Sequence, residues 1–294
     1  MKKNIGLLLV LLVGILTGVS AQGTVKDTIH KKDTTKLTKL IKSITKDSAT
    51  RPETKKDTLI EKKLEKHFYG FHQFRHETGL FIKTPLHWRP TDWLRVGMVL
   101  AITAAIMPFD KTLNNATQGN QRYYYSVPIV AGRVYGEWYT IGTITAVFGG
   151  FGILAHDTAA KKIAIELFQA GAYSELFTEV LKVGIGRSRP YQNEGAFKFR
   201  PFNLNNNNES MPSGHTTSAF ALSTVMFRHA HSTFLKILAF VPAGFTVFSR
   251  LYQNFHWSSD CFLGAVSGFS TGMWVVTLHE KKLHKINVPV DNKL

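Results

Sequence analysis

The chain has 294 residues, enough for one domain of ordinary size with appendages or for two small domains. Lys and Arg number 36 against 20 Asp and Glu, which gives a formal net charge of +16. With 44% hydrophobic residues, the composition excludes a collagen, a disordered polyelectrolyte and a chain made mostly of transmembrane helices. The single cysteine, Cys261, excludes an intramolecular disulfide and a cysteine-based zinc cluster. The basic excess points to an anionic partner: nucleic acid, anionic lipid or a phosphorylated substrate.

Residues 1–21 have the features of a secretory signal peptide. Lys2 and Lys3 form a charged start, residues 5–19 are almost entirely apolar, and Ala21 ends a run of small residues suited to cleavage. The apolar run is shorter than the ~20 residues that a membrane-spanning helix needs. We therefore expect cleavage after Ala21, and an uncleaved membrane anchor is the alternative.

Residues 22–67 form a polar, basic segment that is rich in Lys, Thr and Asp and has no aromatic residue. Such a segment cannot bury enough apolar surface to offset its ordering entropy, so we expect a disordered linker. The helical spacing of Leu37, Leu40, Ile41 and Ile44 leaves open a short amphipathic helix that rests on a surface.

The rest of the chain predicts helices. Residues 68–92 are an aromatic-rich lead-in, residues 93–282 form the core, and residues 283–294 are a C-terminal tail. Helical patterns cover residues 96–107, 139–155 and 159–182, and three more begin near His215, Phe234 and Trp257. Because no internal repeat and no alternating strand pattern is found, the predicted fold class is an all-α bundle.

Two apolar runs, residues 139–155 and 261–278, come near the length that crosses a bilayer. Shorter apolar runs fit buried helices of a soluble bundle equally well.

Three segments in the second half carry the residue types of a phosphate site. The first runs from Lys182 to Arg189 and Pro190, the second is Pro212-Ser213-Gly214-His215, and the third runs from Ser249-Arg250 through His256 to Asp260. Each combines a basic or nucleophilic side chain with a predicted helix end.

The first task of such a site is to bind an anion. Lys182, Arg189 and Arg250 supply cationic donors, and an Arg can bind phosphate oxygens in bidentate fashion. Ser213 occupies a predicted helix N-cap, and the free N–H groups of Gly214 and His215 would face an anion there.

The second task is proton and group transfer. If the last helix begins by His256, then His256 and Asp260 are four residues apart and share a face. A carboxylate that accepts one ring N–H fixes the tautomer and leaves the other nitrogen free as a nucleophile. His215 lies where a general acid for the leaving group is needed.

These segments resemble the type 2 phosphatidic acid phosphatase superfamily, which also holds vanadium haloperoxidases and bacterial non-specific acid phosphatases. Its three-part signature, K-x6-RP, PSGH and SR-x5-H-x3-D, is matched at every specified position from Lys182 to Asp260. The resemblance implies a six-helix bundle that needs no metal or other cofactor.

By the matching positions, the resemblance makes His256 the nucleophile that becomes a phosphohistidine, oriented by Asp260. His215 would protonate the departing alcohol and then activate water. The phosphoryl oxygens would be held by five residues: Lys182, Arg189, Ser213, Gly214 and Arg250.

We therefore expect a phosphatase of the bacterial cell envelope that acts on a phosphorylated lipid or isoprenoid. The alternatives are a periplasmic acid phosphatase for soluble substrates, a vanadate-dependent haloperoxidase and a non-catalytic phosphate-binding module. No protein partner is inferred, and the basic tail carries no nucleic-acid motif.

A cleaved signal places the core in the periplasm at a membrane surface, whereas the Lys-rich segment fits a cytoplasmic N-terminus by the positive-inside rule. We take the signal as the stronger indication.

Several residues outside the signature are given plain structural interpretations. Arg187 is expected to be solvated, and the loop with Lys198, Arg200 and residues 205–208 is expected to have no ligand role. Cys261 is expected to be a small buried side chain. Four histidines match no zinc spacing and are expected at the surface: His229, His231, His279 and His284.

Overall fold

The computed structural model describes residues 71–285, so the predicted signal peptide, the predicted basic linker and residues 286–294 lie outside the described residues. Within that range six helices have 16 or more residues: α5 (Pro90–Ile106), α8 (Trp138–Leu154), α9 (Thr158–Ile185), α10 (Gly214–His229), α11 (Thr233–Tyr252) and α12 (Ser258–Lys285). Three shorter helices were not predicted: α4 (Phe71–Lys83), α6 (Asp110–Gln118) and α7 (Val127–Tyr135). Short 3-10 turns join these helices: η2 (Thr84–His87), η3 (Met107–Phe109), η4 (Pro190–Gln192) and η5 (Asn206–Asn208). The all-α prediction is confirmed over the described residues.

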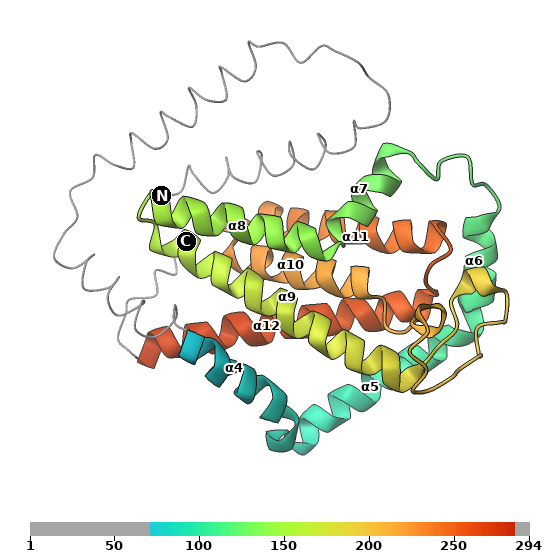
Figure 1. Cartoon of the computed structure of the whole chain (residues 1–294), viewed down its shortest axis with the longest axis horizontal. Coiled ribbons are helices and arrows are strands. Elements are labelled where there is room, and N and C mark those ends of the chain that lie inside the picture. The colour runs from blue at the N-terminus through green and yellow to red at the C-terminus, as the bar shows by residue number, and fades with distance from the viewer. Residues whose placement is uncertain (1–70, 286–294) are drawn as a thin grey trace, which may run out of the picture.

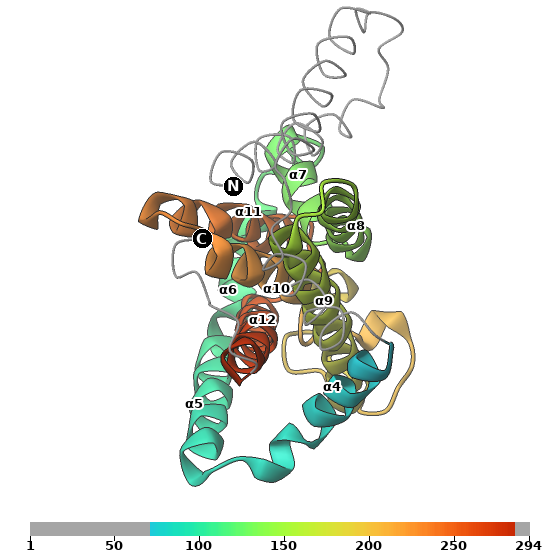
Figure 2. The ribbon, with the colours of Figure 1, turned by 90° about the vertical axis from the view of Figure 1, so that its left-hand side faces the viewer.

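Helix α10 lies at the centre of an elongated bundle, in contact with α9, α11 and α12 (Figure 1). Helix α8 packs on α9, α7 packs on α11, and α5 packs on α12. Figure 2 shows α4 and α5 joined below the bundle, on the side where α9 and α12 lie. Helices α9 and α11 end where α10 and α12 begin, at the right-hand end of Figure 1. This arrangement gathers the three signature segments at one end of the molecule.

Close packing of α10 against α12 depends on glycines four residues apart. A Cβ added at Gly264 would lie 2.6 Å from the carbonyl oxygen of Ser213, and one added at Gly268 would overlap the carbonyl oxygen of Thr217. The absence of side chains lets the two helix starts approach, and the Ser213 N–H donates to the Asp260 carbonyl over 3.1 Å. The glycines thereby fix the second signature segment against the third.

Helix α9 ends at Gly186, whose backbone has the left-handed conformation that only glycine adopts readily. Gly186 has φ 63° and donates its N–H to the Lys182 carbonyl over 2.8 Å. A Cβ at Gly186 would overlap the backbone of Arg200, so the turn also requires the absence of a side chain. The turn directs the chain from Lys182 toward Arg187 and Arg189 across the end of the bundle.

The core of the bundle is apolar, with fully buried side chains that include Phe148, Leu167 and Val225. Helix α4 joins this core through aromatic rings: Phe81 stacks on Tyr173 at 4.8 Å between centroids. The lead-in predicted as aromatic-rich is therefore a helix that packs against α9.

Three stretches of the described chain are long and apolar enough to cross a membrane: Pro90–Gln118, Thr233–Tyr252 and Ser258–Leu283. Large apolar side chains are exposed along two of them, for example Leu94 and Leu100 on α5 and Phe234 and Phe245 on α11. Exposed apolar rows of this kind are characteristic of helices that face lipid or a partner.

Candidate active site

The structure brings the three signature segments together. Lys182 lies in the last turn of α9, Ser213 precedes α10, Arg250 lies in the last turn of α11, and His256 precedes α12. The Lys182 ammonium lies against the start of α10, because a Cβ added at Gly214 would be 3.3 Å from Lys182 Nζ. The predicted site residues therefore share one end of the bundle.

Ser213 occupies the N-cap of α10, as the sequence predicts. Its hydroxyl oxygen accepts from the Thr216 N–H over 3.4 Å and from the Thr216 hydroxyl over 3.0 Å, and the residue is fully buried. The cap fixes the first turn of the helix, whose free N–H groups form the positive end of the helix dipole.

Lys182 and Arg189 are held by polar neighbours. The Lys182 ammonium donates to Glu179 Oε1 over 2.6 Å. Arg189 Nε donates to the carbonyl oxygen of Asn206 over 2.9 Å, and its Nη2 donates to the side-chain oxygen of the same residue over 2.9 Å. The loop from residue 198 to 208 thus positions Arg189, although the sequence indicated no role for it.

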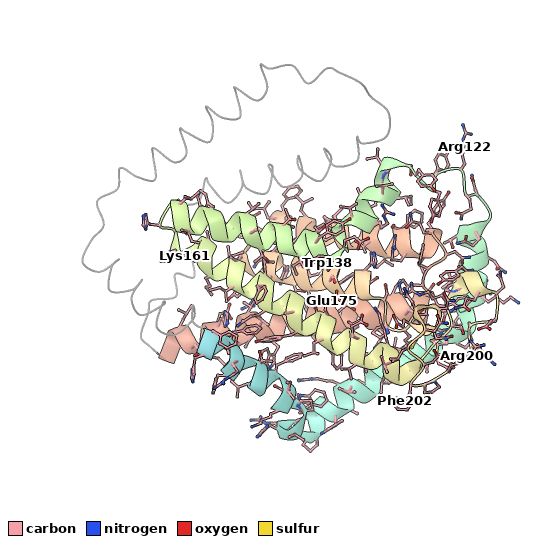
Figure 3. The ribbon with its side chains drawn as sticks, viewed as in Figure 1. Arg122, Trp138, Lys161, Glu175, Arg200 and Phe202 are labelled. Carbon is pink, nitrogen blue, oxygen red and sulfur yellow. The ribbon has the colours of Figure 1, made fainter. Side chains whose placement is uncertain are left out.

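Figure 3 shows the labelled side chains Arg200 and Phe202 at the end of the bundle where α9 ends. Arg200 donates to both carboxylate oxygens of Glu194 and to the Ser188 hydroxyl, so the loop closes on itself beside the site.

Arg250 is almost fully buried and incompletely paired. Its Nη2 donates to Gln253 Oε1 and to the Ser249 hydroxyl, whereas the buried Nε has no hydrogen-bond partner. Leaving a buried donor without a partner costs about 1–3 kcal/mol. An anion that accepted from this donor would recover that free energy.

His256 is buried, and its Nδ1 lies 2.8 Å from the carbonyl oxygen of Ser210. A carbonyl oxygen only accepts, so Nδ1 carries the proton and Nε2 is the nitrogen with the free lone pair. Burial lowers the pKa of His256 well below its usual range, and the positive charges of Arg189 and of a protonated His215 add to the effect. A neutral imidazole with a free Nε2 is the form that acts as a nucleophile.

The expected hydrogen bond from Asp260 to this ring is wrong. Among the described residues no hydrogen bond or ion pair joins the two side chains, because α12 begins at Ser258 and the helical four-residue spacing does not extend back to His256. Asp260 instead accepts from the Ser210 hydroxyl over 2.6 Å and from the Trp257 N–H over 2.8 Å. Asp260 therefore fixes Ser210, whose carbonyl oxygen in turn accepts from the His256 ring.

Arg187 is fully buried, so the expectation that it is solvated is wrong. Its Nη1 donates to Asp260 over 2.6 Å and its Nη2 donates to Asp110 over 2.7 Å. Asp110, which begins α6, also accepts from the backbone N–H of Ser259 over 2.9 Å. The buried ion cluster of Asp110, Arg187 and Asp260 therefore connects α6, the turn after α9 and the start of α12.

Glu137 is a further residue that sequence reasoning missed. Its Oε1 lies 3.1 Å from His215 Nε2, with both side chains about one quarter exposed (23% and 28%). The His215 ring lowers the pKa of Glu137, and Arg250 and Arg133 contribute to this shift. Burial lowers the pKa of His215 and outweighs the opposing effect of Glu137. A lone acidic residue in an apolar stretch gave no signal for this contact.

Two histidines expected at the surface are buried in a second polar cluster. His229 Nε2 lies 2.5 Å from Glu166, and the His279 ring lies 3.3 Å from Glu166 and 3.4 Å from Glu77. Helices α4, α9, α10 and α12 supply this cluster, toward the end of the bundle away from the signature segments. His231 is exposed, and the side chain of His284 lies outside the described residues.

Cys261 is buried, as expected. Within residues 71–283 no group of three or more His, Cys, Asp and Glu side chains is arranged to hold a metal ion.

Fold and site together define an all-α bundle with two histidines and three cations at one end. Residues 164–284, which hold all the signature segments, match the sequence model of the PAP2 superfamily. This match confirms the resemblance to that superfamily that the signature predicts.

Curated relatives with significant similarity include two lipid A 1-phosphatases. The one from Porphyromonas gingivalis is 36% identical over 74 residues, which cover 24% of this chain and 17% of that protein. The one from Rhizobium johnstonii is 32% identical over 117 residues, which cover 38% of this chain and 44% of that protein. A PA-phosphatase related-family protein of Dictyostelium discoideum is 29% identical over 160 residues, 49% of this chain and 58% of that protein. The chain spans less than half the length of the two lipid A 1-phosphatases.

Two solved structures superpose on part of this chain. A transmembrane PAP2 type phosphatidylglycerolphosphate phosphatase from Bacillus subtilis superposes with a TM-score of 0.50 at 22% identity, covering 63% of this chain and 93% of that chain. Aquifex aeolicus LpxE gives a TM-score of 0.46 at 20% identity, covering 57% of this chain and 95% of that chain. The three apolar stretches support a membrane-associated protein.

Proposed function

We propose that the protein is a phosphatase that hydrolyses phosphate monoesters or pyrophosphates of a lipid or isoprenoid through a phosphohistidine. The observation that carries the proposal is the buried, unpartnered Nε of Arg250 beside a buried neutral His256. A cationic donor without an acceptor next to a free nucleophile is what a phosphoryl site requires before its substrate binds.

In the first step His256 Nε2 attacks phosphorus, the bond from phosphorus to the leaving oxygen breaks, and protonated His215 gives its proton to that oxygen. In the second step neutral His215 takes a proton from water, whose oxygen bonds to phosphorus as the P–N bond breaks. Lys182, Arg189 and Arg250 hold the three phosphoryl oxygens, together with the N–H groups at the start of α10. Three fixed cations supply the charge that a metal would otherwise supply.

A lipid substrate is supported by the exposed apolar faces of α5 and α11 and by the names of the curated relatives. The structure and the relatives together favour a phosphorylated lipid over a soluble ester.

The proposal is tested with the full chain purified in mild detergent. We expect release of phosphate from phosphatidate in mixed micelles that exceeds release from p-nitrophenyl phosphate in buffer. His256→Ala should abolish both activities, whereas His76→Ala, on the exposed face of α4, should retain both. Preferential hydrolysis of soluble esters would favour the acid-phosphatase alternative, and activity that persists in His256→Ala would refute the mechanism.

We further propose that the chain is cleaved after Ala21 and that its catalytic end faces the periplasm. N-terminal sequencing of the mature protein and protease access to residues 22–66 in intact spheroplasts test this. An intact Met1 with a protected segment would refute the topology.

A further inference from the structure

Glu137 is a carboxylate beside the cations of a site suited to an anion. A negative charge there opposes phosphate binding, so its presence calls for a physical explanation. Glu137 stands at the N-cap position of α8, but its side chain makes no capping hydrogen bond. Its Oε1 lies 3.1 Å from His215 Nε2 instead.

The segment that carries Glu137 is fitted closely to His215. A Cβ added at the preceding residue, Gly136, would lie 2.7 Å from the His215 carbonyl oxygen and 2.9 Å from His215 Cβ. It would also lie 2.6 Å from the Thr246 side chain. The absence of a side chain at Gly136 therefore brings the junction of α7 and α8 against the start of α10.

We propose that Glu137 is a positioning residue that favours the protonated form of His215 and directs it for the first chemical step. This inference rests on the proposed function, because it concerns the proton that the departing oxygen takes up. Glu137 stays ionised throughout, and the proton moves between His215, the leaving oxygen and water.

The charges around His215 explain why such a residue is needed. Burial lowers the pKa of His215, and the cations Arg250 and Lys182 act in the same direction. His256 lies close enough for the two rings to influence each other. Glu137 is the acidic side chain that raises the pKa of His215 against these groups. The negative charge of a bound phosphate acts in the same direction as Glu137, so the acid form is most stable when substrate is present.

The contact also leaves room for His215 to transfer its proton. His215 Nε2 lies 3.1 Å from Glu137 Oε1, so the carboxylate acts on the ring at close range in the empty site. Nε2 itself is buried, but the His215 side chain is about one quarter exposed, which leaves part of the ring open to a substrate.

The test compares two leaving groups. An alkyl phosphate requires a proton on its leaving oxygen, whereas p-nitrophenolate departs readily without one. In Glu137→Gln, which keeps the shape and removes the charge, we expect kcat/KM to fall about 100-fold for an alkyl lipid phosphate and only a few-fold for p-nitrophenyl phosphate. The alkaline limb of the pH profile for the alkyl substrate should move to lower pH, because the pKa of His215 falls when the carboxylate charge is lost.

Two controls separate this role from a structural one. Asp157→Asn removes charge from a true helix N-cap, where the side chain accepts from the Ala160 N–H over 2.9 Å, and should change neither pH profile nor leaving-group dependence. Inhibition by inorganic phosphate should be as strong or stronger in Glu137→Gln, since a repulsive charge is gone. Equal losses on both substrates, an unmoved alkaline limb or weakened phosphate inhibition would each overturn the proposal. If the wild type hydrolyses neither substrate, the proposed function fails instead.

Discussion

Replacing Arg187 with Met breaks the buried ion cluster that joins α6, α9 and α12. The guanidinium donates to Asp110 and Asp260, and the side chains of all three residues are fully buried. Met fills a similar volume but leaves two carboxylates without their cation in the interior. Removing one partner of a buried ion pair typically costs about 3–5 kcal/mol, so we expect the free energy of unfolding to fall by at least that amount.

The matched control is Arg228→Met. Arg228 also contacts a carboxylate at 2.6 Å, that of Glu280, but these side chains are 31% and 30% exposed. Exposed ion pairs contribute about 0–1 kcal/mol, so the control should lose no more than that. Urea unfolding of both variants in the same detergent, followed by circular dichroism, measures the difference. Equal losses in the two variants would refute the view that the buried cluster holds the site together.

Two further predictions concern pH and metal ions. Burial alone would raise the pKa of Glu77, but hydrogen bonds from His279, Lys282 and Gln73 outweigh it and lower the pKa from 4.5 to about 2. Glu77 therefore stabilises the fold above pH 4.5 and loses this contribution as the pH falls toward 2. The Glu77→Gln variant should be less stable than wild type at pH 7 and should lose less stability on acidification. Thermal unfolding between pH 7 and 3 measures both differences. Activity should survive excess EDTA and be inhibited by vanadate; loss on chelation that magnesium or zinc restores would contradict the role given to the three cations.

The main helices were predictable because their apolar runs are bounded by clear signals. Helix α9 was predicted over residues 159–182 and runs over Thr158–Ile185, and α10 and α11 begin within a residue of their predicted starts. The short helices α4, α6 and α7 were not predicted, since Gly, Asn and aromatic residues obscure their periodicity. Burial against the bundle, which a local pattern does not show, accounts for their formation.

Long-range partners account for what the sequence could not show. Arg187 and Asp110 are 77 residues apart, and nothing local distinguishes a buried Arg from a solvated one. His229 likewise pairs with Glu166 from another helix. The predicted contact between Asp260 and His256 was wrong for a smaller reason. Helix α12 begins two residues later than assumed, so the two side chains do not share a helix face. Errors of one or two residues at predicted helix ends are common, and here such an error produced the wrong contact for Asp260.

The proposed mechanism requires that His256 accepts the phosphoryl group. Rapid quenching of the full chain during turnover of a ³²P-labelled substrate, with alkaline work-up that preserves phosphohistidine, tests it directly when the labelled peptide is sequenced. We expect label on the peptide that contains His256 and none on the His256→Ala variant. Label on a peptide containing His215, label that persists in His256→Ala, or burst-free turnover with no trapped label at any quench time would contradict it.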